Sequence, residues 1–424
     1  MIKSISPLIA SLKEYKSSSF NSDIIAGLTV GIILIPQALA YALLAGVPPI
    51  YGLYSALISM LIYALLGSSY YLSIGPVAIT AILMLKSVSK IHTPFSEPYI
   101  QLIILLGLFI GVFQIILGAL RMGQLTQYIP KTVLSGFIQA AAILIIFSQF
   151  KDALGLMIPS QLSTFETLFY VINHAIEINL LALGLFGFSL LTILLVNSRN
   201  KRFPVALVVF LTSIGMSYYF QLDNKGLQIV GDIPQGFPEL IFPVYEISTF
   251  ISLIPSIFAV TFIGYVGSIG LALSFEHLQE EKVNANKELF VLGLAKVVGA
   301  FFQAFPSTGS FSRTAINVTA GAKTQISSLI TIILLALTLL FITPLFYYLP
   351  NAVLAAIIVH SVFSLLKVDY VKELWGKNKI DFTVFTATFM LTILTSLEIG
   401  VIGGILFYYF LTYSIQLFFN NNKS

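Results

Sequence analysis

Residues 75–82 read GPVAITAI, and residues 309–316 read GSFSRTAI. The two segments align at an offset of 234 residues, and five of the ten aligned positions are identical over 73–82 and 307–316. Each segment is short, rich in small residues and close to apolar stretches. Matched, Gly- or Pro-interrupted segments in the two halves of a membrane protein indicate a transporter's binding site. The second copy contains Arg313 without an acidic neighbour in the sequence, which points to an anionic substrate.

The composition is that of an integral membrane protein. Of the 424 residues, 57% are hydrophobic and only 9% are charged, whereas a soluble protein carries about 25% charged residues. A membrane span needs roughly 20 apolar residues. The sequence predicts an all-α polytopic membrane protein with fourteen spans, of which the third and tenth are short half-helices. The predicted spans are 24–44, 50–67, 76–90, 98–120, 132–150, 175–196, 203–220, 254–275, 287–302, 309–320, 325–348, 351–366, 381–397 and 399–419.

The offset divides these spans into two halves of seven, 24–220 and 254–419. An odd number of spans in each half makes the two repeats inverted in topology, as in many secondary transporters. With a cytoplasmic N-terminus, sixteen of the twenty-two Lys and Arg residues fall on the cytoplasmic side, in agreement with the positive-inside rule. Dropping either half-helix would reverse this pattern. We therefore expect a multi-pass protein of a bacterial-type cell membrane with both termini in the cytoplasm.

Three further features lie outside the apolar spans or interrupt them. Residues 1–23 are amphipathic and have no cleavable apolar core, so we expect them to lie on the cytoplasmic membrane surface. The longest polar loop, 221–253, is acidic and is expected outside the cell. Lys296, within the ninth span, is expected to snorkel to the membrane interface.

Several chemistries are excluded by what the sequence lacks. It has no cysteine, which excludes disulfides, thiolate catalysis and Cys-ligated metals. Its four histidines show no metal-ligand spacing, and no phosphate loop, Ser-His-Asp set or His-Glu-x-x-His motif occurs. The net charge of +4 is spread over loops, so nucleic-acid binding is not expected. We expect no enzyme activity, no catalytic residue, no cofactor and no metal site.

The first span carries a polar pair beside a helix break. Pro36 leaves backbone groups unpaired, and Gln37 and Tyr41 share one face of a helix because they are four residues apart. Such a pair can bind a substrate, or it can simply hydrogen-bond to neighbouring helices, as polar residues in membrane bundles do. The sequence alone leaves these two roles open.

The starts of the half-helices form a second candidate site. Pro76 and the Ser/Gly pattern before Arg313 mark helix N-termini, whose free N–H groups carry roughly half a positive charge. Two such termini meeting from opposite sides of the bilayer would bind an anion through neutral backbone groups. Ser310, Ser312 and Thr314 would add hydroxyl donors. Close helix packing explains the small residues equally well, but it does not explain an arginine at this depth.

Four longer stretches resemble signature sequences of the sulfate permease (SulP) anion-transporter family, the solute carrier 26 type. They are PQALAYALLAGVPPIYGLY (36–54), GSSYYLSIGPVAITAI (67–82), NANKELFVLGLAKVVGAFFQAFPSTGSFSRTAINVTAGAKTQ (284–325) and LPNAVLAAIIV (349–359). These stretches occur in order along essentially the whole chain, which makes the resemblance specific.

The resemblance implies fourteen spans in two intertwined inverted repeats. It implies a mobile core domain formed by 24–120 and 254–348, and a gate domain formed by 121–220 and 349–419 that makes a homodimer. Anion binding between the third and tenth half-helices implies a site at Gln37, Tyr41, Val77, Ala78, Phe311, Ser312 and Arg313, with Thr314 beside them.

The sequence departs from the family pattern in two places. Family members usually end in a cytoplasmic STAS domain, and this sequence stops after the fourteenth span, so no STAS domain is expected. The eighth span of the family often contains a Glu-Ser pair, where this chain has Gly267 and Ser268. An intramembrane carboxylate is the natural proton carrier. Its absence speaks against proton coupling and leaves uniport, exchange and sodium coupling open.

The leading interpretation is a secondary active or facilitative transporter of small inorganic anions, above all sulfate, in which the core moves like an elevator against the gate. Bicarbonate, chloride and dicarboxylates are alternative substrates, because the size of the site is not encoded in any motif. A nucleobase permease of the same fold is disfavoured. The sites of those proteins bind a neutral ring and have glutamates in spans 8 and 10, which this chain lacks. A non-transporting scaffold would have no reason to keep Arg313 between two matched helix breaks.

Overall fold

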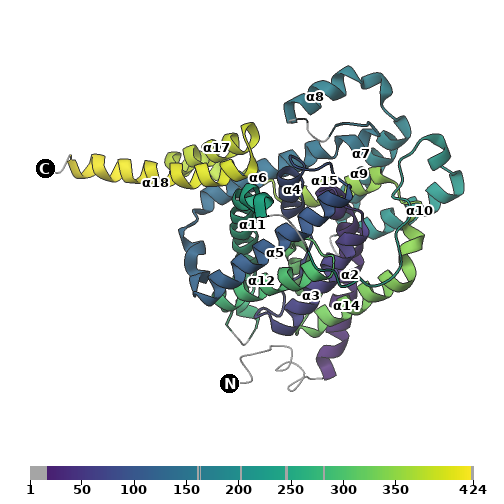
Figure 1. Ribbon diagram of the computed structural model, residues 1–424, viewed down its shortest axis with the longest axis horizontal. Coiled ribbons are helices and arrows are strands. Elements are labelled where there is room, and N and C mark those ends of the chain that lie inside the picture. The colour runs from purple at the N-terminus through teal and green to yellow at the C-terminus, as the bar shows by residue number, and fades with distance from the viewer. Residues whose placement is uncertain are drawn as a thin grey trace.

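The computed structural model describes residues 17–421, apart from 160–161, 163, 201–202, 244–246 and 280–281, and the chain is almost wholly helical (Figure 1). The helices of the first half are α2 (Ser17–Ala45), α3 (Ile50–Leu66), α4 (Ala78–Val88), α5 (Glu97–Ala119), α6 (Lys131–Ser148), α7 (Phe150–Leu154), α8 (Thr164–Asn173), α9 (Leu180–Arg199) and α10 (Val205–Phe220). Those of the second half are α11 (Ile247–Ser274), α12 (Ala285–Phe301), α13 (Phe311–Thr319), α14 (Ile326–Leu337), α15 (Asn351–Phe363), α16 (Val368–Lys377), α17 (Lys379–Leu394) and α18 (Leu397–Asn421). Shorter 3₁₀ and π turns lie between them at η2 (Met122–Tyr128), η3 (Ala175–Glu177), η4 (Asp223–Lys225), η5 (Glu276–Leu278), η6 (Thr338–Ile342) and η7 (Thr343–Phe346).

Two short strands, β1 (Ile74–Gly75) and β2 (Thr308–Gly309), pair antiparallel. Ile74 lies opposite Gly309, and Gly75 lies opposite Thr308, so each strand faces the positions that correspond to it at the offset of 234 residues. Strand β1 leads into α4, and β2 leads into α13. The two short matched segments are therefore neighbours in space, and both half-helices start from one strand pair.

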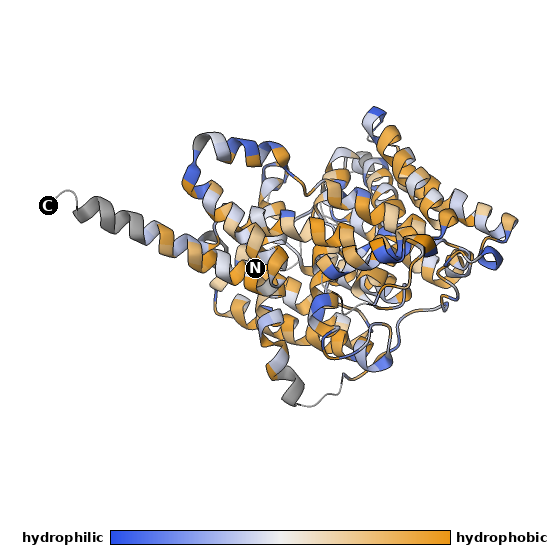
Figure 2. Cartoon of the chain, turned by 90° about the horizontal axis from the view of Figure 1, so that it is seen from above, coloured by the Kyte–Doolittle hydropathy of each residue, from blue (hydrophilic) through white to orange (hydrophobic). Residues whose placement is uncertain are grey.

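Seven of the described helices are long and apolar enough to cross a membrane by length and composition. They are Ser19–Ala45, Glu97–Ala119, Lys131–Leu154, Leu180–Arg199, Ile251–Leu278, Ile326–Phe346 and Asn351–Gly376. Four apolar helices are shorter, at Ile50–Leu66, Ala78–Val88, Val205–Phe220 and Ile399–Tyr413. Hydrophobic residues occupy most of the helices, including those at the periphery of the molecule (Figure 2). Such a composition suits helices surrounded by lipid, because a helix satisfies its own backbone hydrogen bonds.

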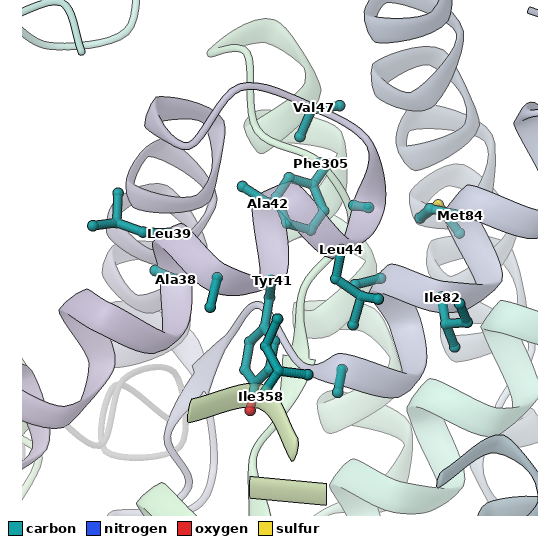
Figure 3. Packing of buried hydrophobic residues seen from close by; sticks show 14 of the residues in the cluster. Ala38, Leu39, Tyr41, Ala42, Leu44, Val47, Ile82, Met84, Phe305 and Ile358 are labelled. Carbon is teal, nitrogen blue, oxygen red and sulfur yellow. The ribbon is translucent and has the colours of Figure 1, made fainter. Parts of the chain in front are cut away.

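Helix α2 connects several parts of the bundle. It packs against α3, α4, α13 and α14, and also against α15. Buried side chains of α2, α4 and α15 form one continuous apolar cluster that includes Leu44, Ile82 and Ile358 (Figure 3). Residues of α2 can therefore touch both half-helices and α15.

Helices α5 and α12 lie side by side because glycines face each other across their interface. A Cβ atom added to Gly111 would lie 2.7 Å from the Gly293 carbonyl oxygen, and one added to Gly293 would lie 2.6 Å from that of Gly111. One added to Gly118 would lie 2.8 Å from the backbone nitrogen of Phe290. Small residues let helix backbones approach closely within a membrane, so these two helices are in backbone contact.

Two sequence predictions about segment boundaries need correction. Helix α11 begins at Ile247 rather than near residue 254, because Pro255 lies inside the helix instead of starting it; the predicted linker 221–253 is shorter accordingly. Helix α9 begins at Leu180 rather than at 175, because the Asn179 side chain caps its first N–H groups. Residues 1–16 of the predicted N-terminal surface segment lie outside the described residues. Residues 17–23 form the first turns of α2.

Replacing Gly111 by alanine should lower the Tm of the detergent-purified protein, because the added methyl group would press against the backbone of α12. Overpacking of this kind costs about 1–3 kcal/mol. Gly187→Ala on α9 is the matched control, since a Cβ atom at Gly187 has no atom within 4 Å. Alanine favours a helix over glycine by about 1 kcal/mol, so this control should keep or raise the Tm. Equal losses in both variants would contradict the packing account.

Candidate functional site

Arg313 lies in the first turn of α13, three residues after the N-cap Ser310, and its side chain is 0% exposed. Its Nη1 donates to the Gln37 side-chain oxygen at 3.0 Å and to the Pro76 carbonyl at 3.2 Å. Its Nε donates to the Ser73 hydroxyl at 3.4 Å. The guanidinium therefore joins α13 to α2 and to the segment around β1, and these three partners are all neutral.

The remaining nitrogen of this guanidinium, Nη2, is buried and has no hydrogen-bond partner among the described residues. It lies next to Gly75, where a Cβ atom would approach it to 3.0 Å. A buried donor without a partner costs about 1–3 kcal/mol, and more when it is charged. An anion that reached Nη2 would supply both the missing acceptor and the missing negative charge.

Gln37 and Tyr41 lie one turn apart on α2 and are 6% and 5% exposed. Because the Gln37 Oε1 accepts from Arg313, the Nε2 of the same amide is directed elsewhere, to the Ser361 hydroxyl of α15 at 3.5 Å. The Tyr41 ring lies in the same apolar cluster as Ile358 of α15 (Figure 3). Of the two roles left open by the sequence, the structure shows the contact with a neighbouring helix, which Gln37 makes. Gln37 also contacts Arg313, and substrate binding by the pair stays a prediction.

Four predicted site residues lie at the starts of the half-helices. Val77 is the extended N-cap residue of α4 and is half-buried, and Ala78, the first residue of α4, is buried. Phe311, the first residue of α13, is 55% exposed, so its ring does not pack into the protein. Ser312 is half-buried, and its hydroxyl lies 3.4 Å from that of Ser310. Of these positions, Val77 and Ala78 directly follow Pro76, whose carbonyl Arg313 contacts.

Thr314 has a structural contact as well as a place in the site. Its hydroxyl oxygen accepts from the Ser73 N–H at 3.1 Å. Thr80, the corresponding residue of the first segment, has its hydroxyl 3.2 Å from that of Thr308. Each half-helix is thus held to the opposite strand segment by the threonine that the two segments share.

Two serines hold β2 and the residues before it, and the sequence did not predict this role for either of them. Ser268 on α11 accepts from the Gly309 N–H at 2.8 Å. Ser55 on α3 accepts from the Phe305 N–H at 2.7 Å, and the Ser307 hydroxyl contacts the Ser55 carbonyl at 3.4 Å. These hydroxyls satisfy backbone groups of the irregular segment before α13, which is largely buried.

Glu288 is a buried carboxylate that the sequence reasoning did not single out. It accepts from the Tyr63 hydroxyl at 2.8 Å and from the Ser68 N–H and hydroxyl at 2.7 Å and 2.6 Å. It therefore ties α12 to the loop between α3 and β1. Only its place in the stretch NANKELF could have drawn attention to it.

The prediction that Lys296 snorkels to the membrane interface is wrong. Its side chain is 4% exposed, and its Nζ donates to the Gln114 side-chain oxygen at 3.0 Å and to the Leu292 carbonyl at 3.3 Å. Gln114 belongs to α5, which α12 approaches closely at Gly293. The ammonium group is thus satisfied inside the helix pair, by a partner that is distant in the sequence.

Replacing Thr314 by valine should lower the free energy of unfolding by about 1–3 kcal/mol, because the buried Ser73 N–H would lose its acceptor. Thr314→Ser keeps the hydroxyl and should retain most of the stability. The Tm of the two purified variants in detergent measures the difference. A loss as large in the serine variant would assign the effect to the methyl group.

Comparison with known families agrees with the resemblance found in the sequence. The model described as the sulfate permease family matches residues 20–388. The chain is 37% identical over 416 residues to the probable sulfate transporter 4.2 of Arabidopsis thaliana, and the alignment covers 95% of this chain and 61% of that protein. It is 34% identical over 437 residues to the sodium-independent sulfate anion transporter of Bos taurus, and this alignment covers 94% of this chain and 70% of that protein. The chain thus spans less than two thirds of the length of the plant relative.

Solved structures share the same fold. The murine solute carrier 26 family member A9, an anion transporter in the inward-facing state, matches with a TM-score of 0.89 and 27% identity over 98% of this chain and 72% of that one. The transmembrane domain of the cyanobacterium bicarbonate transporter BicA matches with a TM-score of 0.80 and 23% identity over 91% of this chain and 98% of that one; at this identity the likeness concerns the fold alone. The family model matches most of the chain, and the chain covers more than two thirds of a relative to which it is more than 30% identical. This chain therefore belongs to the sulfate permease family.

Proposed function

We propose that this chain carries small inorganic anions, with sulfate as the main substrate, across the membrane as a secondary active or facilitative transporter. One observation carries the proposal: Arg313 is fully buried, its partners are neutral, and its Nη2 lacks a partner among the described residues. A guanidinium is permanently charged and presents donors in a fork that suits oxyanions. The names of the relatives support sulfate among these anions.

The recognition chemistry of this site would use one fixed charge and several neutral donors. A sulfate oxygen would accept from Nη2, and the backbone N–H groups at the starts of α4 and α13 would face the remaining oxygens. A charge at a helix N-terminus is stabilised by about 0.3–2 kcal/mol. Only part of the sulfate charge is balanced by a residue, so the site would select an anion without holding it permanently, as a transported substrate requires.

The proposed topology has fourteen spans in two inverted repeats. The strand pairing supports it, because Ile74 lies opposite Gly309 and Gly75 opposite Thr308, so that a twofold axis between the strands would exchange equivalent positions. Four short apolar helices would complete or share spans with their neighbours. Both termini would lie in the cytoplasm, as the lysine and arginine distribution favours.

The proposed mechanism is an elevator-type motion of a core domain, 24–120 and 254–348, against a gate domain, 121–220 and 349–419. Hydrogen bonds from Arg313 to Gln37 and from the Ser68 N–H to Glu288 join the two segments of the core, which supports their moving as one unit. The gate would also form a homodimer. Helices α17 and α18 project from one side of the molecule (Figure 1), a position open to a second copy.

The direct test is uptake of radiolabelled sulfate into proteoliposomes containing the purified chain. Arg313→Gln should lower sulfate uptake at least about tenfold, because a hydrogen bond to a charged group contributes about 1.5–3 kcal/mol and about 1.4 kcal/mol is a factor of ten. Arg199→Gln is the matched control, since Arg199 is exposed at the end of α9, and it should transport normally.

The same vesicles test the choice of substrate. Unlabelled sulfate should compete best, with bicarbonate, chloride and a dicarboxylate weaker. Native uptake by Arg313→Gln would contradict the site, and preferential uptake of labelled bicarbonate would contradict sulfate as the main substrate.

A further inference from the structure

Ser361 brings a side chain of α15 to the candidate site from outside the predicted core. Its hydroxyl donates to the Ile357 carbonyl of its own helix at 2.8 Å. The proton of this hydroxyl is therefore committed to α15, and the oxygen lone pairs are what Ser361 offers to α2. The neighbouring His360 contacts Asn197 of α9 at 2.9 Å, which anchors this part of α15 to another helix of the predicted gate.

One donor of α2 meets this oxygen. Gln37 donates through Nε2 at 3.5 Å, and this orientation of the amide is set by Arg313, which occupies the Gln37 Oε1. A neutral oxygen of α15 therefore accepts from a side chain that is a candidate to donate to an anion.

The surroundings of Ser361 on α15 are apolar. Ile357 and Ile358, one turn earlier, are each 2% exposed and belong to the apolar cluster that includes Tyr41 (Figure 3). If the Ser361 oxygen were removed, Gln37 Nε2 would face aliphatic groups. Buried donors without acceptors are unfavourable, so the empty site would then be costly to hold against α15.

We propose that Ser361 is a positioning residue that stands in for an anion oxygen when the site is empty, and so allows the empty core to pass the gate. This inference rests on the proposed function. A bound anion satisfies the Gln37 donor itself, so the step that carries substrate does not need Ser361. The step that returns the empty site across the membrane does need Ser361. The chain would therefore perform net uptake as well as exchange, and Ser361 would set the ratio between them.

The experiment compares two modes of sulfate transport in the same proteoliposome preparations. Net uptake is measured into sulfate-free vesicles, where every cycle needs the empty return, and exchange is measured into vesicles preloaded with unlabelled sulfate. In Ser361→Ala, net uptake should fall about five- to tenfold while exchange stays within about twofold of the unmodified protein, which corresponds to losing the acceptor of one buried hydrogen bond. Ser361→Thr keeps the oxygen and should restore net uptake.

Ser364→Ala is the matched control on the same helix. The Ser364 hydroxyl is exposed and donates to the Ser361 carbonyl, so its loss should change neither mode. Equal loss of both modes in Ser361→Ala, or no change in either, would overturn the inference, as would an unmodified protein that exchanges sulfate without any net uptake. Absence of both modes in the unmodified protein would instead refute the proposed function together with this inference.

Discussion

A guanidinium buried against neutral partners is the constraint around which the centre of this molecule is arranged. Arg313 cannot reach water, and a buried charge is tolerated only where hydrogen bonds or a counterion compensate for it. Its partners come from α2, from the Pro76 carbonyl and from Ser73, so three segments must stay in register to keep it satisfied. Since Nη2 still lacks a partner among the described residues, the compensation is incomplete there, and the proposed anion would complete it.

The strand pair explains how two helix starts and one cation come together. Thr314 and Thr80 hold each half-helix to the opposite segment, and Gly75 leaves the space beside Nη2 that a Cβ atom would take. The two segments differ at the decisive position, where Ile79 of the first corresponds to Arg313 of the second. A near-symmetric backbone can therefore supply two helix N-termini while only one repeat supplies a charge.

The position of this arginine also determines which polar atoms of α2 remain available. By occupying the Gln37 oxygen, Arg313 directs the amide nitrogen of Gln37 away from itself and toward α15. The same side chain thus shapes the contact between the predicted core and the predicted gate. Binding and motion would then be coupled through one short series of hydrogen bonds rather than through a distant network.

Local sequence patterns predicted where the two half-helices begin. The short helices α4 and α13 start within two residues of the predicted breaks, because Pro76 and the Ser/Gly run disfavour continuing helix. The hydrogen-bond partner of a side chain is a long-range property, which a local pattern does not encode. The sequence predicts Lys296 at the membrane interface, whereas Gln114 of another helix accepts its hydrogen bond. No local signal indicated that Ser361 would meet Gln37.

Two other features depend on long-range contacts in the same way. The Thr314 oxygen accepts from the Ser73 backbone N–H, a contact that a sequence pattern cannot reveal; its predicted donation to a ligand stays a prediction. The sequence did not predict the early start of α11, because Pro255 suggests a helix start. Neighbouring helices can accommodate a proline within a span.

The central claim is that an anion completes the coordination of Arg313, and equilibrium binding to the purified protein tests it most directly. A ligand that binds the native state alone raises the Tm with its concentration. Sulfate at constant ionic strength should therefore raise the Tm of the unmodified protein, and it should raise that of Arg313→Gln little or not at all. An equal sulfate-dependent rise in both proteins would contradict the account, because the anion would then bind without the guanidinium.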